Sequence, residues 1–174
     1  MSRLKPTISI EALGRQDLPA ALSIQAETYP TFLIEDEDTF LSRINRTASY
    51  CLAAKHGEEL LGYLLAHSWR RQSPPPLGTV LPDDVPSEVL FIHDLAVSSA
   101  YRGLMVGQRL ITRAFELAAQ DGLRSAELIA VEGAADYWRR LGFVEGEVSR
   151  KFLEKLETYG PSARWMTCEV PLKR

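Results

Sequence analysis

Hydrophobic positions along this chain recur at two spacings, one typical of strands and one typical of helices. Short runs rich in aliphatic and aromatic residues predict strands at 8–13, 50–55, 60–67, 91–97, 126–131, from Gly142-Phe143 onward, and at 163–170. The turn residues 56–59 predict a hairpin between the second and third of these strands.

Apolar side chains three and four residues apart predict helices between the other strands. The first follows Asp17, its expected N-cap, and runs to the Tyr29-Pro30 break. The others are predicted at 37–46, 104–120 and 134–141, the third of the four ending at Asp121-Gly122. Residues 72–86 contain five prolines, which exclude helix and sheet interior, so they predict a long surface loop. Such a loop is either a functional lid or a spacer.

The order of these elements predicts an α/β fold. The strand–helix–strand unit over 91–131 requires parallel pairing, whereas the hairpin over 50–67 is antiparallel. We therefore predict a mixed sheet with helices on both faces.

Composition narrows the class of protein. The 174 residues are most simply one domain, 1–174. A net charge of −3 gives no general attraction to nucleic acid or to an anionic membrane. No apolar run approaches the ~20 residues of a membrane span, and the first ten residues lack a secretion signal. Cys51 and Cys168 lie far apart without metal-ligand spacing, so we expect buried free thiols in a cytoplasmic protein and no metal.

The stretch 91–108 has the features of an anion-binding site. A strand leads into a short loop with an arginine and glycines, and then into a helix whose first N–H groups lack intrahelical partners. Glycine lets an anion approach the backbone closely. The residues that supply the cation and the N–H groups are Arg102, Gly103, Leu104, Met105, Val106, Gly107 and Gln108.

This loop, with two flanking segments, resembles the GNAT acetyltransferases. Their acyl-CoA motif is Q/R-x-x-G-x-G/A, which matches 102–107 except that Met105 replaces the first glycine. Leu95-Ala96-Val97 precedes it as in the family, and 137–143, YWRRLGF, follows about 30 residues on. The resemblance extends over nearly the whole chain. His93-Asp94 and His67-Ser68-Trp69 look closest to the arylalkylamine (serotonin-type) N-acetyltransferases and their bacterial relatives.

The resemblance implies a centrally splayed sheet, acetyl-CoA as co-substrate and no metal. It assigns Leu95, Ala96, Val97 and the loop 102–108 to cofactor binding. Backbone groups of Leu95 and Val97 would bind the pantetheine arm, and an N–H near Val97 would polarise the thioester carbonyl. Trp138 stands where the family has a tyrosine acid and would pack beside the cofactor, since indole has no usable acid.

The residues that move protons are open at this stage. His93 matches a family histidine and is the first candidate base, or else a structural, hydrogen-bonded histidine. Strand alternation places Phe91, His93, Leu95 and Val97 on one face and Asp94 on the other. His93 or Asp94 could then reach the cleft, but not both. Asp94 fits a structural role better, satisfying loop N–H groups.

The general acid is open as well. Tyr137 lies one residue before the family position, which turns its side chain by about 100° on a helix. Tyr159 is a second candidate, and unaided departure of the thiolate is a third route.

Two further features have alternative interpretations. Met105 is expected in the first turn of the helix, where its cost is only steric; a positive φ there would instead lower cofactor affinity sharply. The acidic run 35–38 is expected to be solvated and to complement a helix dipole. The alternative is recruitment of a cationic amine together with Trp69, Tyr29 and Phe32.

We therefore expect an N-acetyltransferase that acts on a small primary amine, arylalkylamine or polyamine-like, as a monomer or homodimer. The alternatives are an acyl-CoA-binding protein with lost catalysis, an enzyme that acetylates a protein or peptide amine, and an interaction module without cofactor.

Overall fold

A computed structural model describes residues 6–170 of the chain, so the first five residues of the N-terminal segment discussed above lie outside it. Its strands are β1 (Ser9–Ala12), β2 (Leu52–His56), β3 (Glu59–Trp69), β4 (Val89–Val97), β5 (Ser125–Ala130), β6 (Val144–Glu145) and β7 (Arg164–Glu169). Its helices are α1 (Leu18–Thr28), α2 (Glu37–Ile44), α3 (Val106–Gln120), α4 (Ala135–Arg140) and α5 (Arg150–Glu157). Short 3-10 turns are η1 (Arg15–Asp17), η2 (Thr31–Leu33) and η3 (Ser99–Tyr101).

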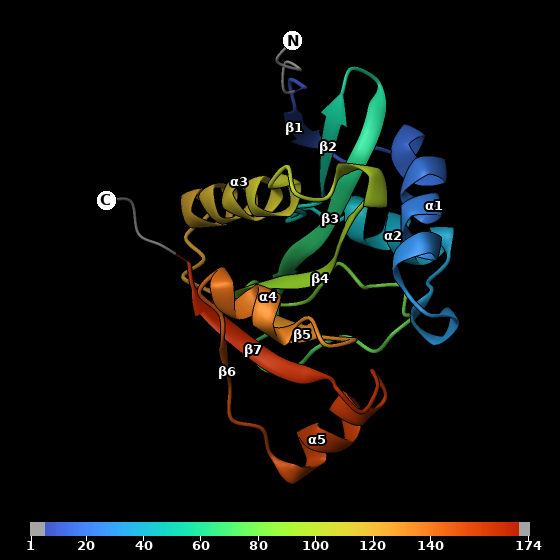
Figure 1. The fold of residues 1–174 in the computed structure, drawn as a ribbon. Helices are drawn as coiled ribbons and strands as arrows, with labels where there is room; N and C mark the ends of the chain where they lie inside the picture. Colours follow the sequence, from blue (N-terminus) through green and yellow to red (C-terminus); the bar gives the residue numbers. More distant parts are fainter. Residues whose placement is uncertain (1–5, 171–174) are drawn as a thin grey trace.

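The strands form one sheet in the order β1-β2-β3-β4-β5-β7-β6. Only the β4–β5 pair is parallel; the other pairs are antiparallel. This confirms the predicted mixed α/β sheet. Strands β4 and β5 pair over three residues each, Leu90–Ile92 of β4 with Ala126–Leu128 of β5. The two strands then separate and leave a gap beside the second half of β4 (Figure 1).

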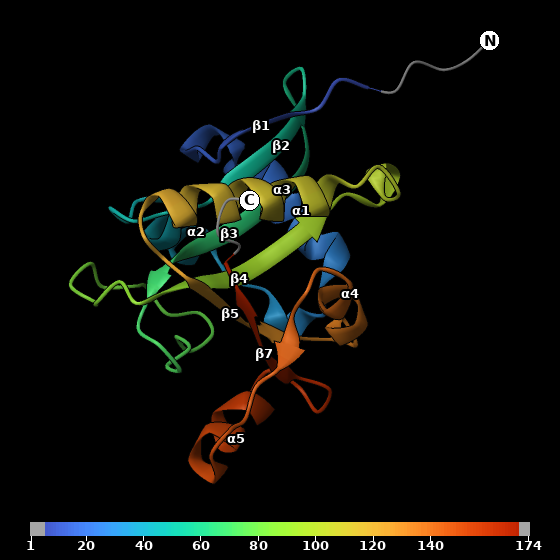
Figure 2. The same cartoon turned by 90° about the vertical axis from the view of Figure 1, so that its left-hand side faces the viewer.

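Helices cover both faces of this sheet, as predicted. On one face α3 and α4 pack through Leu110, Ala114 and Trp138, and on the other α1 and α2 pack through Leu18 and Phe40. Figure 2 shows α3 in front of the sheet with α1 and α2 behind it. A third apolar cluster joins β4, α5 and the proline-rich segment. Within residues 6–170, no helix is both long enough and apolar enough to cross a membrane.

A β-bulge in β4 changes which side chains share a face. Leu65 of β3 lies opposite Asp94 and Ala66 lies opposite Ile92, so His93 is the extra residue. The alternation predicted from the sequence is therefore wrong beyond this point. His93 and Asp94 both face α1 and α2, where they bond Glu35 and Tyr63, whereas Leu95 and Val97 pack with the core under α3.

Some element bounds differ from the predictions. The second helix ends at Ile44 rather than at 46, and the third begins at Val106 rather than at 104. The helix α5 was not predicted, although Ser149 caps it by accepting the Phe152 N–H at 3.1 Å. Both cysteines are free, but Cys168 is only partly buried, unlike Cys51.

Candidate active site

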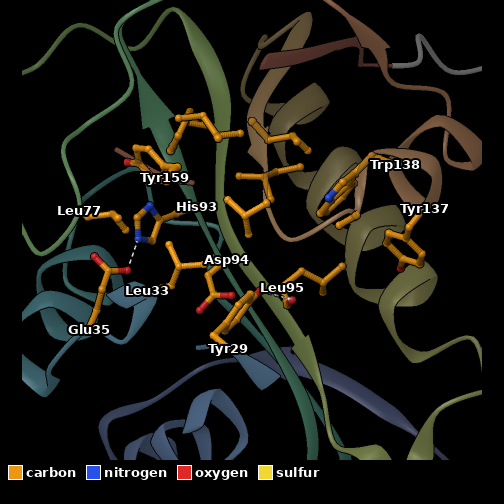
Figure 3. Close-up of a pocket in the computed structure, with 16 residues that line it drawn as sticks. Tyr29, Leu33, Glu35, Leu77, His93, Asp94, Leu95, Tyr137, Trp138 and Tyr159 are labelled. Carbon is orange, nitrogen blue, oxygen red and sulfur yellow. Dashed lines mark hydrogen bonds and ion pairs between the residues drawn. The ribbon is translucent and has the colours of Figure 1, made fainter. Parts of the chain in front are cut away.

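Two adjoining cavities open where β4 and β5 separate. The larger, of about 680 Å³, lies along the N-terminus of α3, and we call it the cofactor cavity. The smaller, of about 120 Å³, lies between β4, β5 and the α1–α2 loop, and we call it the acceptor cavity (Figure 3). The residues that line both are Tyr29, Leu95, Val131, Ala134 and Tyr137. The two spaces therefore meet beside Leu95.

Most of the residues assigned to cofactor binding line the cofactor cavity. They are Leu95, Ala96, Val97, Arg102, Gly103, Met105, Val106, Gly107 and Gln108. Leu104 does not line it, and Trp138 lines the acceptor cavity instead, where it packs edge-on against Phe143. The first turn of α3 leaves its N–H groups without intrahelical partners, since the first α-helical bond runs from Arg109 N to Met105 O. With the helix dipole and Arg102, this end of the cavity suits a phosphate.

Met105 does not lie in the first helical turn, so that prediction is wrong. It is the N-cap of α3, with φ +59° and ψ 28°, a left-handed conformation. Gly103 is also left-handed, at φ +87°, so φ changes sign on either side of Leu104. Such alternation turns successive N–H groups toward one concave side, an anion-binding arrangement. The Met105 side chain is 62% exposed. The non-glycine residue therefore introduces backbone strain, which is where its cost lies.

Tyr137 of α4 lies across the N-terminus of α3 at the boundary between the cavities. A Cβ on Gly107 would collide with the Tyr137 hydroxyl, so glycine at 107 accommodates this tyrosine. Burial raises the pKa of Tyr137, with Arg140 acting in the opposite direction. Tyr159, the other candidate acid, donates its hydroxyl to Pro75 O at 2.7 Å, and burial raises its pKa. Of the two tyrosines, Tyr137 alone lines both cavities.

His93 is held by two charged partners. Arg43 lies 3.4 Å from Nδ1, and a guanidinium can only donate, so Nδ1 accepts and Nε2 carries the proton. Nε2–H donates to Glu35 Oε1, as the dashed line in Figure 3 marks. The base role of His93 stays a prediction, but both ring nitrogens are engaged, and this arrangement favours a positioning role.

Glu35 is buried, so the expectation of a solvated acidic run is wrong for its first residue. Its carboxylate bonds His93, accepts the Gly78 N–H at 2.8 Å and lies 3.9 Å from Arg43. Burial alone would raise the pKa of Glu35, but His93 and Arg43 outweigh it and lower the pKa to about 2. Asp36 follows the prediction: its side chain caps α2 by accepting the Thr39 N–H at 2.9 Å.

Asp94 lines the acceptor cavity and is 9% exposed. Its Oδ2 accepts the Tyr63 hydroxyl at 2.6 Å, so its partner is a strand tyrosine and not the loop N–H groups that were expected. Among residues 6–170, Oδ1 has no hydrogen-bond partner. The neighbouring Tyr29 gives its only proton to Leu95 O at 2.9 Å. Burial raises the pKa of Asp94, against the lowering effect of the nearby hydroxyls of Tyr63 and Tyr29.

Three segments beside the acceptor cavity are hydrogen-bonded to one another. Tyr159 bonds Pro75 and Glu35 bonds Gly78, and a Cβ on Gly160 would lie 3.5 Å from the Phe32 ring. The α1–α2 loop, the proline-rich loop and the segment before β7 are thereby tied together. Trp69, the other aromatic residue considered for amine recruitment, instead stacks against Arg46, with 5.1 Å from the guanidinium carbon to the ring centroid.

Sequence reasoning missed the role of Glu35, the Tyr63–Asp94 bond and the bulge. In the sequence, Glu35 is the first of four consecutive acidic residues. The one signal that distinguishes it is its position before Asp36, the N-cap of α2, which places it outside the helix. Within the described part of the chain, no group of three potential ligands could hold a metal ion.

The model of the acetyltransferase (GNAT) family matches residues 18–143. This range includes β4, α3 and α4, whose residues line the two cavities. The chain belongs to the GNAT family. This confirms the family resemblance and places the chain among the GNAT-type acetyltransferases. The narrower arylalkylamine placement stays a prediction.

Individual relatives agree with this family. An uncharacterised N-acetyltransferase of Methanocaldococcus jannaschii is 40% identical over 73 residues, which cover 40% of this chain and 32% of that protein. The ribosomal-protein-S18-alanine N-acetyltransferase of Escherichia coli is similar in fold, with TM-score 0.68, 17% identity and 97% of each chain covered. The PaiA N-acetyltransferase of Thermoplasma acidophilum, solved with coenzyme A, has TM-score 0.66 and 14% identity, covering 94% of this chain and 99% of its own. At these identities the solved structures support the fold alone.

Proposed function

We propose that this protein transfers an acetyl group from acetyl-CoA to the primary amine of a small molecule by direct attack. The observation that carries the proposal is the junction of the two cavities at Leu95, next to Asp94 of the acceptor cavity. A cavity suited to a phosphate-bearing co-substrate there meets a small, largely apolar cavity that contains a buried carboxylate.

The residues of the cofactor cavity fit coenzyme A. The α3 N-terminus and Arg102 would hold the pyrophosphate, and the backbone of Leu95 to Val97, facing the gap beside β4, would bind the pantetheine arm. Acetyl-CoA supplies an acetyl thioester, a carbonyl activated for attack by nitrogen. Several solved relatives carry coenzyme A, among them the PaiA enzyme, which supports the same use here.

Asp94 is the carboxylate placed to accept the proton of an incoming ammonium. A general base must lie within hydrogen-bond reach of the proton it removes, and Asp94 Oδ1 is the buried oxygen that is free to do so. Its burial raises its pKa, which brings its basicity closer to that of an amine. In the balanced transfer a C–N bond forms and the C–S bond breaks. The ammonium loses two protons, one through Asp94 to solvent and one to the departing thiolate.

The small volume of the acceptor cavity, about 120 Å³, favours a small molecule over a peptide. A peptide acceptor needs a groove through which its chain can leave the site. Here the hydrogen bonds Tyr159–Pro75 and Glu35–Gly78 tie together the three segments beside the cavity. The aromatic lining, Tyr29, Phe91 and Tyr159, suits an amine with an apolar or aryl body, which includes the arylalkylamines.

Calorimetry with acetyl-CoA and thiol release across small amines and N-terminal peptides test the proposal. We expect acetyl-CoA to bind, and small amines but not peptides to release CoA. Binding without release would indicate an acyl-CoA-binding protein, and absence of binding an interaction module. Asp94→Asn should lower kcat/KM by at least about ten-fold, within the range of a lost general base. Asp84→Asn, the same change on the exposed loop, should leave kcat/KM unchanged.

A further inference from the structure

We propose that the acceptor is a compact apolar monoamine without carboxylate or phosphate, whose ammonium binds Asp94 Oδ1. This inference rests on the proposed function and narrows it. It follows from the charges that line the acceptor cavity and from which of their hydrogen-bonding positions are already used.

The cavity offers no lysine or arginine to an anion, and both ring nitrogens of its one histidine, His93, are already engaged. Sixteen residues line it, and none is lysine or arginine. Arg43 is fully buried and contacts two of the lining residues, Glu35 and His93. Its guanidinium also donates to the carbonyls of Thr39 and Thr79. A carboxylate on the acceptor would therefore be buried beside Glu35 and Asp94 without a counter-ion. Burying an unpaired charge is costly, so amino acids are excluded as good acceptors.

The cavity offers one position to a cation. Both Glu35 oxygens are engaged, one by His93 and the other by the Gly78 N–H with Arg43 nearby. Asp94 Oδ2 accepts the Tyr63 hydroxyl. In the described chain this leaves Asp94 Oδ1 as the buried carboxylate oxygen without a partner. One free anionic oxygen matches one ammonium.

The proton of Tyr29 explains why this oxygen is free. Tyr29 packs beside Asp94, as Figure 3 shows, and the Asp94 charge contributes to raising the pKa of this tyrosine. A hydroxyl has one proton, however, and Tyr29 donates it to Leu95 O. Asp94 is thus flanked by aromatic rings and keeps one oxygen for the ligand, next to the backbone where the two cavities meet.

The remainder of the lining suits a hydrocarbon body. It consists of aliphatic and aromatic side chains, including Leu33, Leu77, Phe91, Leu128, Ile129 and Val131. A second ammonium, as in a polyamine, would lie among these side chains without a partner. This argues against the polyamine-like acceptor and for a monoamine.

The test compares acceptors of equal chain length on the wild-type protein with acetyl-CoA. Butylamine, 1,4-diaminobutane and 4-aminobutanoate share four carbons and differ only in the group at the far end. We expect kcat/KM for butylamine to exceed that for each of the others by at least about ten-fold, equivalent to 1.4 kcal/mol. A diamine or amino acid acetylated as well as butylamine overturns the inference and leaves the proposed function standing. Acetylation of peptides with no small amine accepted overturns both.

A binding measurement isolates the role of Asp94. Asp94→Asn keeps an oxygen for the Tyr63 hydroxyl but removes the charge. With coenzyme A bound, we expect butylamine affinity to fall by about ten-fold or more, while coenzyme A affinity and the melting temperature stay near wild type. Unchanged amine affinity would overturn the assignment. If the variant does not fold, the three-acceptor comparison on the wild type still decides the inference.

Discussion

Replacing Met105 by glycine and by alanine gives a direct test of the loop before α3. Both variants remove a side chain that is 62% exposed, so they differ mainly in the backbone cost at φ +59°. A non-glycine residue in the left-handed region costs roughly 1–2 kcal/mol. Glycine avoids this cost, but its greater conformational freedom in the unfolded chain lowers the stability of the folded state by about 0.4–1 kcal/mol relative to alanine. We therefore expect Met105→Gly to be more stable than Met105→Ala by about 0.5–1 kcal/mol.

The opposite order would follow if residue 105 were part of the helix, because alanine is preferred there over glycine by about 1 kcal/mol. The sign of the difference thus distinguishes the two conformations. Urea unfolding measures it directly, and the melting temperatures should differ by a few degrees, since 1 kcal/mol corresponds to about 2–4 °C at this chain length. A more stable alanine variant would refute the left-handed assignment. Met105→Asn is the intermediate control, because asparagine tolerates this region better than alanine does.

Three other changes test neighbouring parts of the site. Gly107→Ala should weaken coenzyme A binding and stability through its collision with the Tyr137 hydroxyl, and Tyr137→Phe in the same chain should restore stability, measured by urea unfolding of both variants. Because the pKa of Glu35 is lowered to about 2, its stabilisation is full above pH 4.5 and is lost as pH falls toward 2. Glu35→Gln should therefore be less stable than wild type at pH 7, and the gap should shrink on acidification; a constant gap would contradict this. Tyr159→Phe removes the bond to Pro75 and should raise KM for the amine while leaving the coenzyme A affinity unchanged.

The parts of the fold that local patterns determine were predictable from the sequence. The apolar run of β4 and the helical spacing of α3 place the strand–loop–helix unit correctly, because each pattern extends over many residues. The helix α5 carries the same kind of signal, with a Ser149 cap and apolar side chains at 152, 153 and 156, and was missed because it is short and mostly charged. Its presence supplies Leu156 to the cluster under the acceptor cavity.

The chemistry of the site depended on features with no local signature. Nothing near Glu35 in the sequence indicates Arg43, His93 and Gly78 as partners, because these come from a helix, a strand and a loop that only the fold brings together. The left-handed Met105 is similar: no residue type enforces that conformation, and the surrounding loop and helix impose it on a residue that disfavours it.

The bulge at His93 connects these observations. A regular strand would turn Asp94 and Leu95 to the faces opposite to those they occupy, since strand side chains alternate with a period of two. The one extra residue reverses that pattern midway along β4. Asp94 thereby faces Tyr63 and the α1–α2 loop, while the next residue, Leu95, contacts the core under α3 and lines both cavities. In the proposed reaction, the carboxylate that receives the acceptor's proton and the backbone that binds the acyl donor thus come from the adjacent residues Asp94 and Leu95, which the bulge turns to opposite faces.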